Sequence, residues 1–377
     1  MSSESYIIDG CRSPIGLKNG KMIGVRSDDL TAMVIEGLMK RNPNIEKSDI
    51  EDVVIGCAFP EGSQGMLMAR AISILSDLPI ESGAKIVNRF CGSSMDAVHQ
   101  LSQAIISKDL DIGIAGGCED MFSVPMGGFN PSFHPELYEK ELYIGMGDTA
   151  ENLAKELNIS REDQEDFAIE SHNKALSAIA NASFSSEIIP VNINEHLIKN
   201  DEGPRNPDIE KIKSLEPAFD SEGTITAATS SPVSVGAAAA IIMSKEKANK
   251  NGISPKFKIL SRSIAGVDWR VMGTGPLPAT EKALKKANLT LNDIDIIELN
   301  EAFAAQSLYV IRKGKWDMAK INLNGGAIAL GHPLGCSGVR ILITLMNIME
   351  QKDKNLGLAT MCIGSGQGIA TIIERVN

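Results

Sequence analysis

The sequence has no excess of positive charge. Its 377 residues include 37 Lys and Arg against 48 Asp and Glu, which gives a formal net charge of −11 at pH 7. Nucleic-acid-binding proteins contact phosphate groups through basic patches, so this balance argues against a general nucleic-acid-binding role. It does not exclude an anionic ligand, because a few local N–H donors can bind phosphate on an acidic protein.

Signals for secretion, membrane insertion and disulfide scaffolding are also missing. The N-terminal segment MSSESYIIDG lacks a basic region followed by an apolar one. No apolar run approaches the ~20 residues needed to span a bilayer. The six cysteines form no CxxC pair and lie at positions 11, 57, 91, 118, 336 and 362. Together these absences predict a cytoplasmic protein with reduced thiols.

Strand-like and helix-like segments alternate along the chain, which predicts an α/β fold. Hydrophobic residues make up 43% and charged residues 23% of the sequence, as in ordinary soluble proteins. The segment DVVIGCAF is typical of a buried strand, residues 93–107 have helical periodicity, and DIGIAGG follows as the next strand. A chain of this length can bury full cores in two or three domains.

The last third of the chain repeats the pattern of the first third. SDIEDVVIGCAF at 48–59 resembles NDIDIIELNEAF at 292–303, and AKIVN at 84–88 resembles AKINLN at 319–324. A repeat of about 100 residues is far longer than a solenoid repeat. It predicts two copies of one βα unit packed as a pseudo-dimer, with KINLNGG as a strand of the second copy. Chance similarity between short α/β segments is the alternative.

Cysteines lie at similar places in the two copies. Cys91 and Cys336 both come just before the repeated helix, and the strands IGIAGGC and LGLATMC follow at similar offsets. The repeat assigns residues 1–120 with 233–255 to a first core half and residues 256–377 to a second. Residues 121–232, which are rich in loops, are an insertion, and long insertions on a compact core are usually lids or binding loops.

Cys91 is the first candidate for chemistry. Small residues follow it, and then apolar residues at helical spacing, so its thiol lies at a helix N-terminus. The helix dipole and free N–H groups lower the pKa of a cysteine there. Partial burial raises it. A buried, unreactive thiol is the alternative interpretation.

Two further candidates lie in glycine-rich turns. His332 is the only one of the five histidines in such a turn, GGAIALGHPLGCSG, where its alternative role is one structural hydrogen bond. Cys362 ends a buried strand and runs into GSGQG. The GxGxG spacing differs from a dinucleotide fingerprint and no ribose-binding acid follows, so we predict no Rossmann site.

Cys91, His332 and Cys362 all lie at strand-to-loop junctions. The carboxyl ends of parallel strands converge, and α/β proteins place their sites there. One interpretation is a catalytic Cys/His pair with a second cysteine as acid and base. The other is a Cys₂His zinc site, although zinc ligands usually include a closely spaced pair and these three are far apart.

Four motifs resemble the signatures of the thiolase family, in the family's order. The resemblance covers essentially the whole chain and is greatest to the bacterial 3-ketoacyl-CoA branch, the β-subunit type of the fatty-acid-oxidation complex. The motifs are VNRFCGSSMDA at 87–97, NEAFAAQ at 300–306, NLNGGAIALGHPLGCSG at 322–338 and CIGSGQG at 362–368.

The resemblance implies a fold and a set of binding partners. The fold is a five-layered α/β/α/β/α arrangement of two βαβαβαββ halves with an inserted loop domain that binds CoA. The family uses no metal and no permanently bound cofactor, and coenzyme A is a co-substrate. A homodimer or higher oligomer is implied, together with a possible α-subunit that carries hydratase and dehydrogenase activity.

The resemblance also implies roles for five residues. Cys91 is the nucleophile that accepts the acyl group, and His332 activates it and later the CoA thiol. Cys362 exchanges a proton with the acetyl carbon. Asn300 holds a water that, with His332, binds the enolate oxygen, and the N–H groups of Cys91 and Gly364 form a second oxyanion hole.

Contacts with CoA are implied for three more residues. Ser231 matches the family's pantetheine-contacting position, and Met146 lies near the acyl pocket. Arg205 contacts a CoA phosphate in this scheme, and an exposed, solvated charge is its alternative role. Two positions depart from the family pattern. Val235 replaces an Asp that orders the loop near Ser231, and Ser365 replaces a Gly or Leu beside Gly364.

The implied activity is thiolysis of 3-ketoacyl-CoA to acyl-CoA and acetyl-CoA, a step of fatty-acid β-oxidation. Acetoacetyl-CoA synthesis from two acetyl-CoA molecules is the alternative with the same residues. A decarboxylating ketoacyl synthase needs a second His or Asn where this chain has Cys362. A non-catalytic acyl-CoA-binding scaffold is the remaining alternative, although the catalytic side chains are all present.

Overall fold

The molecule contains one large sheet that consists of two halves. The halves are joined where one strand of the first pairs with one strand of the second. The computed structural model describes residues 4–376. Within them the strands follow the order β10-β11-β12-β9-β1-β8-β5-β3-β4. The halves meet where β1 pairs with β9 over only two residue pairs, Tyr6–Lys258 and Ile7–Phe257. The first half contains β1 (Ser5–Arg12), β2 (Gly16–Leu17), β3 (Asp52–Gly56), β4 (Gly83–Val87), β5 (Ile112–Asp120) and β8 (Ser234–Ser244). The second contains β9 (Phe257–Gly266), β10 (Ile296–Leu299), β11 (Leu356–Ile363) and β12 (Gln367–Arg375).

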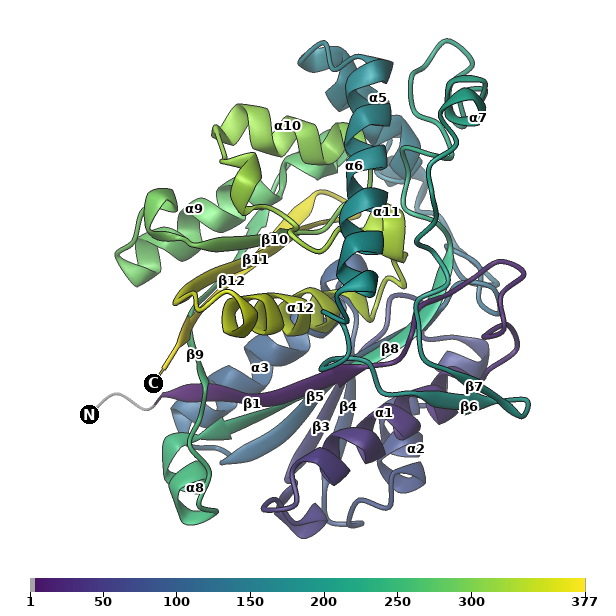
Figure 1. The fold of residues 1–377 in the computed structure, drawn as a ribbon. Helices are drawn as coiled ribbons and strands as arrows, with labels where there is room; N and C mark the ends of the chain where they lie inside the picture. The colour runs from purple at the N-terminus through teal and green to yellow at the C-terminus, as the bar shows by residue number, and fades with distance from the viewer. Residues whose placement is uncertain (1–3, 377) are drawn as a thin grey trace.

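Helices fill the space between the two half-sheets and cover their outer faces (Figure 1). The central layer contains α3 (Ser93–Ser107) and α12 (Ser337–Gln351), which pack against each other. The outer layers contain α1 (Ser27–Arg41) and α2 (Met68–Leu75) on one side, and α9 (Pro276–Ala287) and α10 (Ala304–Gly314) on the other. The shorter α8 (Lys245–Lys250) and α11 (Ala327–Leu330) link core elements. The predicted five-layered α/β/α/β/α fold is therefore confirmed.

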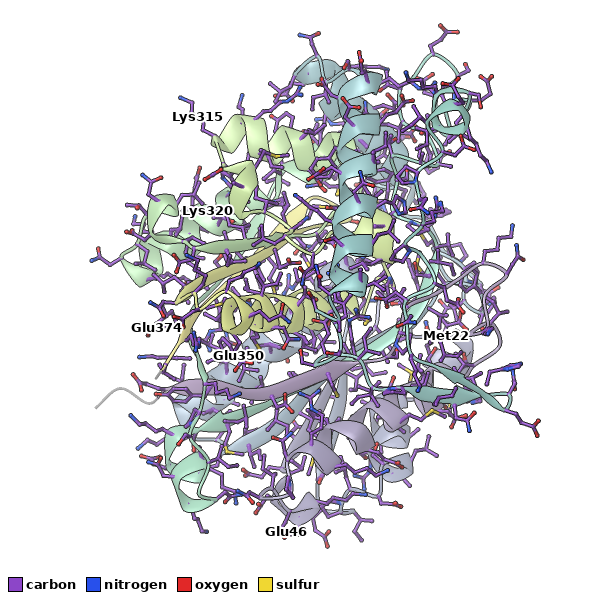
Figure 2. The ribbon with its side chains drawn as sticks, in the orientation of Figure 1. Met22, Glu46, Lys315, Lys320, Glu350 and Glu374 are labelled. Carbon is purple, nitrogen blue, oxygen red and sulfur yellow. The ribbon has the colours of Figure 1, made fainter. Side chains whose placement is uncertain are left out.

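Three apolar cores hold these layers together. One lies between the first half-sheet and α1 and α2, one surrounds α3 and α12, and one lies between the second half-sheet and α9 and α10. Burying apolar surface contributes roughly 25 cal/mol per Å², so these three cores supply most of the favourable free energy of folding. Charged side chains such as Glu46 and Lys315 project outward (Figure 2).

The repeat is visible in the register of the elements. When Ser93, the first residue of α3, is placed on Ser337, the first of α12, Ile112 falls on Leu356, so the next strands also start together. Parallel pairing agrees, because Val54–Ala115 in the first half corresponds to Glu298–Ala359 in the second.

This register refines the predicted pairing of cysteines. In this register Cys336 corresponds to Gly92, and Cys91 corresponds to Gly335. The first half therefore carries a thiol where the second half has no side chain. A Cβ on Gly335 would lie 2.7 Å from the Cys57 Cα and from the Gly56 carbonyl oxygen, so that position has no room for one.

The prediction of a strand at KINLNGG is wrong. Only Ile321 forms a parallel bridge, with Ile297, and residues 318–320 form a 3₁₀ turn. The reason is the Asn322 side chain, which accepts from the Leu299 N–H at 2.9 Å and donates to the Leu299 carbonyl at 2.8 Å. It thus replaces the hydrogen bonds that a neighbouring strand would supply.

The segment between β5 and β8 forms a separate layer beside the second half. It contains α4 (Pro135–Glu139), α5 (Met146–Glu156), α6 (Arg161–Ala180), β6 (Val191–Ile193), β7 (His196–Ile198) and α7 (Ile209–Lys213). The helix α6 packs on α10 and α11. Arg12 anchors the segment, because its guanidinium group contacts Glu187 at 2.7 Å and Asp201 at 2.6 Å in the interior. Nowhere between residues 4 and 376 is a helix long and apolar enough to cross a membrane.

Candidate active site

Cys91 lies in a tight turn between β4 and α3. The turn spans Phe90–Gly92, and the Ser93 hydroxyl closes it by accepting from the Arg89 N–H at 2.8 Å and donating to the Phe90 carbonyl at 2.6 Å. Phe90 has a φ of 41°, in the left-handed region that a bulky aromatic residue rarely adopts. Such strain persists only where the surroundings enforce it, and it is common next to reactive groups.

A glycine brings this turn against the second half of the molecule. A Cβ on Gly92 would lie 2.6 Å from the Ile363 Cδ1 atom at the end of β11. Only a residue without a side chain fits there, so the start of α3 reaches the loop that begins at Gly364. Cys91 is consequently placed at the junction of the two copies.

Burial outweighs the helix terminus in setting the acidity of Cys91. Burial raises the pKa of the Cys91 thiol to about 11, and the backbone N–H groups of Gly364 and of Cys91 itself oppose the rise. These are the two N–H groups that the resemblance assigns to an oxyanion hole. The predicted lowering of the pKa by the helix terminus does not prevail, and the resting thiol keeps its proton near neutral pH.

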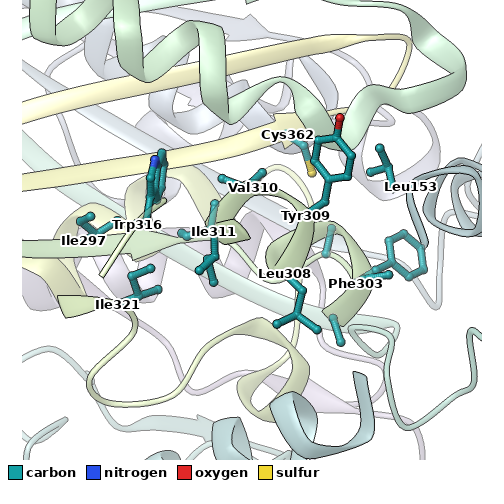
Figure 3. Packing of buried hydrophobic residues seen from close by; sticks show 14 of the residues in the cluster. Leu153, Ile297, Phe303, Leu308, Tyr309, Val310, Ile311, Trp316, Ile321 and Cys362 are labelled. Atoms are coloured by element: carbon teal, nitrogen blue, oxygen red, sulfur yellow. The ribbon is translucent and has the colours of Figure 1, made fainter. Parts of the chain in front are cut away.

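Cys362 lies near the end of β11 and is fully buried. It belongs to the outer apolar core that includes Val310 and Tyr309 of α10 (Figure 3). Burial raises the pKa of the Cys362 thiol, and the charge of a Cys91 thiolate raises it further. This coupling indicates that the two sulfurs lie near one another, with Cys362 as a proton-holding thiol.

His332 is buried in the turn between α11 and α12. Its backbone N–H donates to the Ser234 hydroxyl at 3.0 Å, and its ring Nδ1 lies 2.6 Å from the Ser337 hydroxyl. The Ser337 hydroxyl donates to the Pro333 carbonyl at 3.0 Å, so it accepts from an Nδ1–H. This tautomer leaves the Nε2 lone pair able to accept a hydrogen bond. Gly331 permits the turn with a φ of 112°.

Asn300 faces the free side of the imidazole. Its backbone N–H donates to the Thr360 carbonyl at 3.0 Å, which fixes it just beyond β10. Its Nδ2 lies 3.4 Å from His332 Nε2, and its buried Oδ1 has no hydrogen-bond partner among the described residues. Burial, and then the charge of Arg340, lower the pKa of His332 to about 3. The imidazole is therefore neutral in the resting protein.

The starts of the two central helices bring these groups together. The Ser94 hydroxyl of α3 donates to the Cys336 carbonyl at 3.1 Å and accepts from the Val339 N–H of α12 at 3.0 Å. The turns that carry Cys91 and His332 are thus joined by hydrogen bonds. The arrangement supplies a thiol nucleophile, a neutral base and a second thiol beside unpaired hydrogen-bonding groups, which suits acyl transfer.

One buried carboxylate that supports this region was not identified from the sequence. Glu119, at the end of β5, is 1% exposed and accepts from the Ala58 N–H at 2.7 Å. It also accepts from the Gly335 N–H at 2.9 Å, in the loop that follows His332. Glu119 therefore ties the first half to the histidine turn. Its position within a buried strand was the only available signal, since buried carboxylates need several donors.

Ser234 and Ser337 were also missed. Both hold His332, one through its backbone and the other through its ring. Ser337 had a usable signal, because it lies within the glycine-rich turn and begins the helix. Ser234 comes from the distant β8 strand, and only the tertiary structure brings it to the histidine.

The three predicted CoA-contacting residues have different surroundings. The Met146 Sδ lies 3.3 Å from the place that a Cβ on Gly364 would take, so Met146 borders the Cys91 site. The Ser231 N–H donates to the Ala302 carbonyl at 3.0 Å, beside Asn300. Arg205 is exposed; its backbone N–H donates to the His172 ring and its guanidinium group donates to the Gly203 carbonyl.

The two departures from the family pattern have clear structural settings. Val235 is buried in β8, opposite Asp120 of β5, where an apolar residue packs in the first-half core. Ser365 lies at the tip of the hairpin between β11 and β12, with a left-handed φ of 62°. As for the zinc alternative, residues 4–376 contain no group of three His, Cys, Asp or Glu side chains arranged to hold a metal ion.

Known proteins match the whole chain. Family models described as "Thiolase, N-terminal domain" and "Thiolase, C-terminal domain" match residues 5–246 and 253–375. The chain is 48% identical over 388 residues to a 3-ketoacyl-CoA thiolase of Marinomonas sp. (strain MWYL1), covering 99% of both chains. It is 47% identical over 383 residues to that of Idiomarina loihiensis, covering 98% of this chain and 99% of the other. A crystal structure of the Bacillus anthracis acetyl-CoA acetyltransferase superposes with a TM-score of 0.92 at 33% identity, covering 100% of this chain and 99% of the other.

Proposed function

The chain belongs to the thiolase family, and from this premise we propose that it is a 3-ketoacyl-CoA thiolase. It is an acyltransferase that cleaves 3-ketoacyl-CoA with CoA to acyl-CoA and acetyl-CoA. The observation that carries this proposal is the meeting of a thiol from the first copy with a neutral histidine, an amide and a second thiol from the second copy. Its cellular role is in fatty-acid β-oxidation in the cytoplasm.

The first half-reaction forms an acyl-enzyme. His332 Nε2 takes the proton of the Cys91 thiol, and the sulfur attacks the C3 ketone of the substrate. The C2–C3 bond then breaks, which leaves the acyl group on Cys91 and acetyl-CoA as an enolate. His332 and a water held by Asn300 Oδ1 bind the enolate oxygen, and the Cys362 thiol gives its proton to C2.

The second half-reaction regenerates the thiols. His332 first returns its proton to the Cys362 thiolate. His332 then takes the proton of the incoming CoA thiol, and the CoA sulfur attacks the acyl carbon. The N–H groups of Cys91 and Gly364 bind the developing oxyanion. Cys91 leaves as a thiolate and recovers its proton from His332. The free enzyme returns with both thiols protonated, in agreement with the raised pKa of each.

The insertion is the proposed CoA-binding part. Residues 121–232 are its extent, with the first core half at 1–120 and 233–255 and the second at 256–377. Met146 and Ser231 of this segment border Gly364 and the Asn300 loop, which supports a substrate path along its inner side. Arg205 is proposed to contact a CoA phosphate from the exposed end of that path.

We further propose that the protein forms a homodimer and binds an α-subunit. Strand β4 ends the sheet order, and exposed apolar side chains lie near it: Met66 is 99% and Ile80 is 77% exposed. A second copy that covers this edge would bury them. A separate exposed aromatic group on the insertion, which includes Phe129, Phe133 and Tyr138, is the proposed contact for the α-subunit.

A chain-length series of thiolysis rates tests the activity. Purified protein is assayed with CoA and 3-ketoacyl-CoA substrates from four carbons upward, and ping-pong kinetics are expected. Turnover of long substrates supports the β-oxidation role, whereas turnover of acetoacetyl-CoA alone supports the acetyltransferase alternative. Absence of thiolysis at every chain length contradicts the proposal.

A further inference from the structure

Glu298 of β10 and Arg340 of α12 face each other in the interior, near the turn that carries His332. Arg340 Nη1 lies 3.7 Å from Glu298 Oε2, and both side chains are 1% exposed. Among the described residues, neither Glu298 Oε1 nor any guanidinium nitrogen has a hydrogen-bond partner. Taking charges out of water costs several kcal/mol per ion, and a pair this loosely bonded does not recover that cost well. Stability therefore does not explain why the pair is there.

The pair connects the two elements that hold His332. Glu298 precedes Asn300 by two residues, and Asn300 contacts Nε2 of the imidazole. Arg340 follows Ser337 by three residues on one helix, and Ser337 contacts Nδ1. Residues three apart on a helix are neighbours on its surface. The contact between Glu298 and Arg340 thus links two elements. One is strand β10, which leads to Asn300 at Nε2, and the other is helix α12, which carries Ser337 at Nδ1.

The first copy of the repeat serves as an internal control. In the shared register, Val54 occupies the position of Glu298 and Asp96 that of Arg340. Val54 is fully buried in the central apolar core. Asp96 forms its ion pair with Arg89 of the neighbouring turn, at 3.3 Å, and not with strand β3, which carries Val54. The architecture is therefore satisfied without a buried pair between strand and helix, and only the copy that carries His332 has one.

We propose that Arg340 and Glu298 are positioning residues that hold His332 and Asn300 at a fixed separation and place a fixed positive charge beside the imidazole. The inference rests on the proposed function, because it assigns the pair to the base of that reaction. The charge favours a neutral ring, since a second positive charge on the imidazole is repelled. The lowered pKa of His332, to which Arg340 contributes after burial, agrees with this role.

Other charged groups also face the pair. The positive charges of Arg340 in α12 and Lys174 in α6 lower the pKa of Glu298. The negative charges of Glu187, after α6, and Glu301, after β10, raise it. Of these, Arg340 opposes the burial of the carboxyl most strongly. Glu187 and Glu301 have close partners of their own, in Arg12 and Ser171. The guanidinium group of Arg340, whose nitrogens form no hydrogen bond within the described residues, is therefore the main positive charge on Glu298.

Replacing both members of the pair separates positioning from stability. The double variant Glu298→Val with Arg340→Met places valine on the strand, as at Val54 of the first copy, and an apolar residue of similar length on the helix. Such replacements of buried charged pairs are often neutral or stabilising. We expect kcat for thiolysis to fall by about tenfold or more while KM changes by less than about twofold. In Arg340→Met alone, the acid limb of the kcat profile should move to higher pH. Arg340→Lys should recover part of kcat, because it keeps the charge.

Spectroscopy gives a second readout that does not need turnover. With ¹⁵N-labelled histidine, the wild type should show one neutral His332 tautomer with its proton on Nδ1, identified by its loss in His332→Gln. The double variant should show averaging between the ring nitrogens. Val54→Ala is the matched control, because it damages packing at the equivalent position of the first copy and should leave both the tautomer and the pH profile unchanged.

The outcomes separate the two proposals. Absence of thiolysis in the wild type contradicts the proposed function, whereas the histidine spectra still test the positioning role. A double variant that folds, keeps kcat within about twofold of wild type and keeps the fixed tautomer overturns the inference. Equal shifts in the Val54→Ala control would also overturn it, because they would show a general effect of packing.

Discussion

The two copies of the βα unit have the same backbone and different chemistry at matching positions. At the start of the central helix, the first copy has Cys91 and the second has Gly335. At the end of the inner strand, Cys118 of the first copy corresponds to Cys362 of the second. The first copy contributes its helix start to the site, and the second contributes its strand ends and its histidine turn.

This division shows how a repeated fold forms one site from two unlike halves. Cys118 and Cys362 both face an outer apolar core, yet only Cys362 lies near Cys91. The N–H groups that face the Cys91 sulfur likewise come from both copies, one from Cys91 and one from Gly364. Substitutions at matched positions should therefore have unequal effects, and each of the following pairs tests that asymmetry.

The largest difference is expected between Cys91→Ala and Cys336→Ala, two thiols that lie one residue apart in the shared register. Removing the nucleophile should lower thiolysis by at least about a thousandfold, since no other group can accept the acyl chain. Cys336 is a buried thiol in the central core, so its loss should cost about 1–2 kcal/mol of stability and little activity. Rates and urea unfolding of both variants measure this, and undiminished activity in Cys91→Ala would sink the assignment of the nucleophile.

The next difference is expected between Cys362→Ala and Cys118→Ala. Loss of the proton-carrying thiol should reduce thiolysis by about 10²–10⁴-fold. Acylation of Cys91 should remain detectable by mass spectrometry in Cys362→Ala, and an unlabelled Cys91 would contradict the division of roles. Cys118→Ala should remain active, because Cys118 contacts only buried groups such as the Met68 sulfur at 3.8 Å.

A smaller effect is expected for Ser337→Ala, with Ser93→Ala at the matching helix start as its counterpart. Ser337→Ala leaves the Nδ1–H without its acceptor, and a net hydrogen bond of about 1 kcal/mol corresponds to roughly a fivefold loss of kcat. Ser93→Ala should instead loosen the Cys91 turn, because Ser93 closes it. The acid limb of the kcat profile should shift only in Ser337→Ala, and a shift in both would remove the distinction.

The last difference concerns stability rather than activity, at Glu298 and its apolar counterpart, Val54. Burial raises the pKa of Glu298 to about 8, while Arg340 opposes the rise. The folded carboxyl thus keeps its proton when the unfolded one has lost it. Its stabilising contribution is complete below about pH 4.5 and is lost as the pH rises to about 8, by at most ~1.4 kcal/mol per unit.

Urea unfolding of Glu298→Gln at pH 5 and pH 8 measures this contribution. The variant should lose less stability than wild type between the two pH values, because glutamine does not titrate. Val54→Ala should lower the free energy of unfolding by a similar amount at both. An identical pH dependence in wild type and Glu298→Gln would show that the carboxyl does not change its proton in this range.

Much of the fold could be predicted because it depends on periodic patterns. The alternation of apolar segments gave the α/β class, and the similarity of residues 48–59 to 292–303 gave the repeat. The strand expected at 320–326 could not be excluded in the same way. Its apolar pattern suits a strand, and only the folded chain shows that the Asn322 side chain occupies the hydrogen bonds of Leu299.

The reactive residues were visible in the sequence because glycine-rich turns and the family motifs mark them. Cys91, His332 and Cys362 could be proposed from the sequence alone. Their pKa values, in contrast, depend on the folded structure. The helix start at Cys91 predicts a lowered pKa, whereas burial raises it to about 11. Burial depends on side chains from the other copy, such as Ile363 against Gly92, and the local sequence holds no record of them.

The sequence by itself determined the α/β class, the repeat and the candidate reacting groups. These follow from local periodicity, from residue types at turns and from the resemblance to the thiolase motifs. Only the tertiary structure decided which copy supplies which group, how Glu119, Ser234 and Ser337 brace the histidine turn, and that Glu298 pairs with Arg340. The physical reason is that these contacts join residues far apart in the chain. Their energies depend on burial and distance, which exist only after the two copies have packed together.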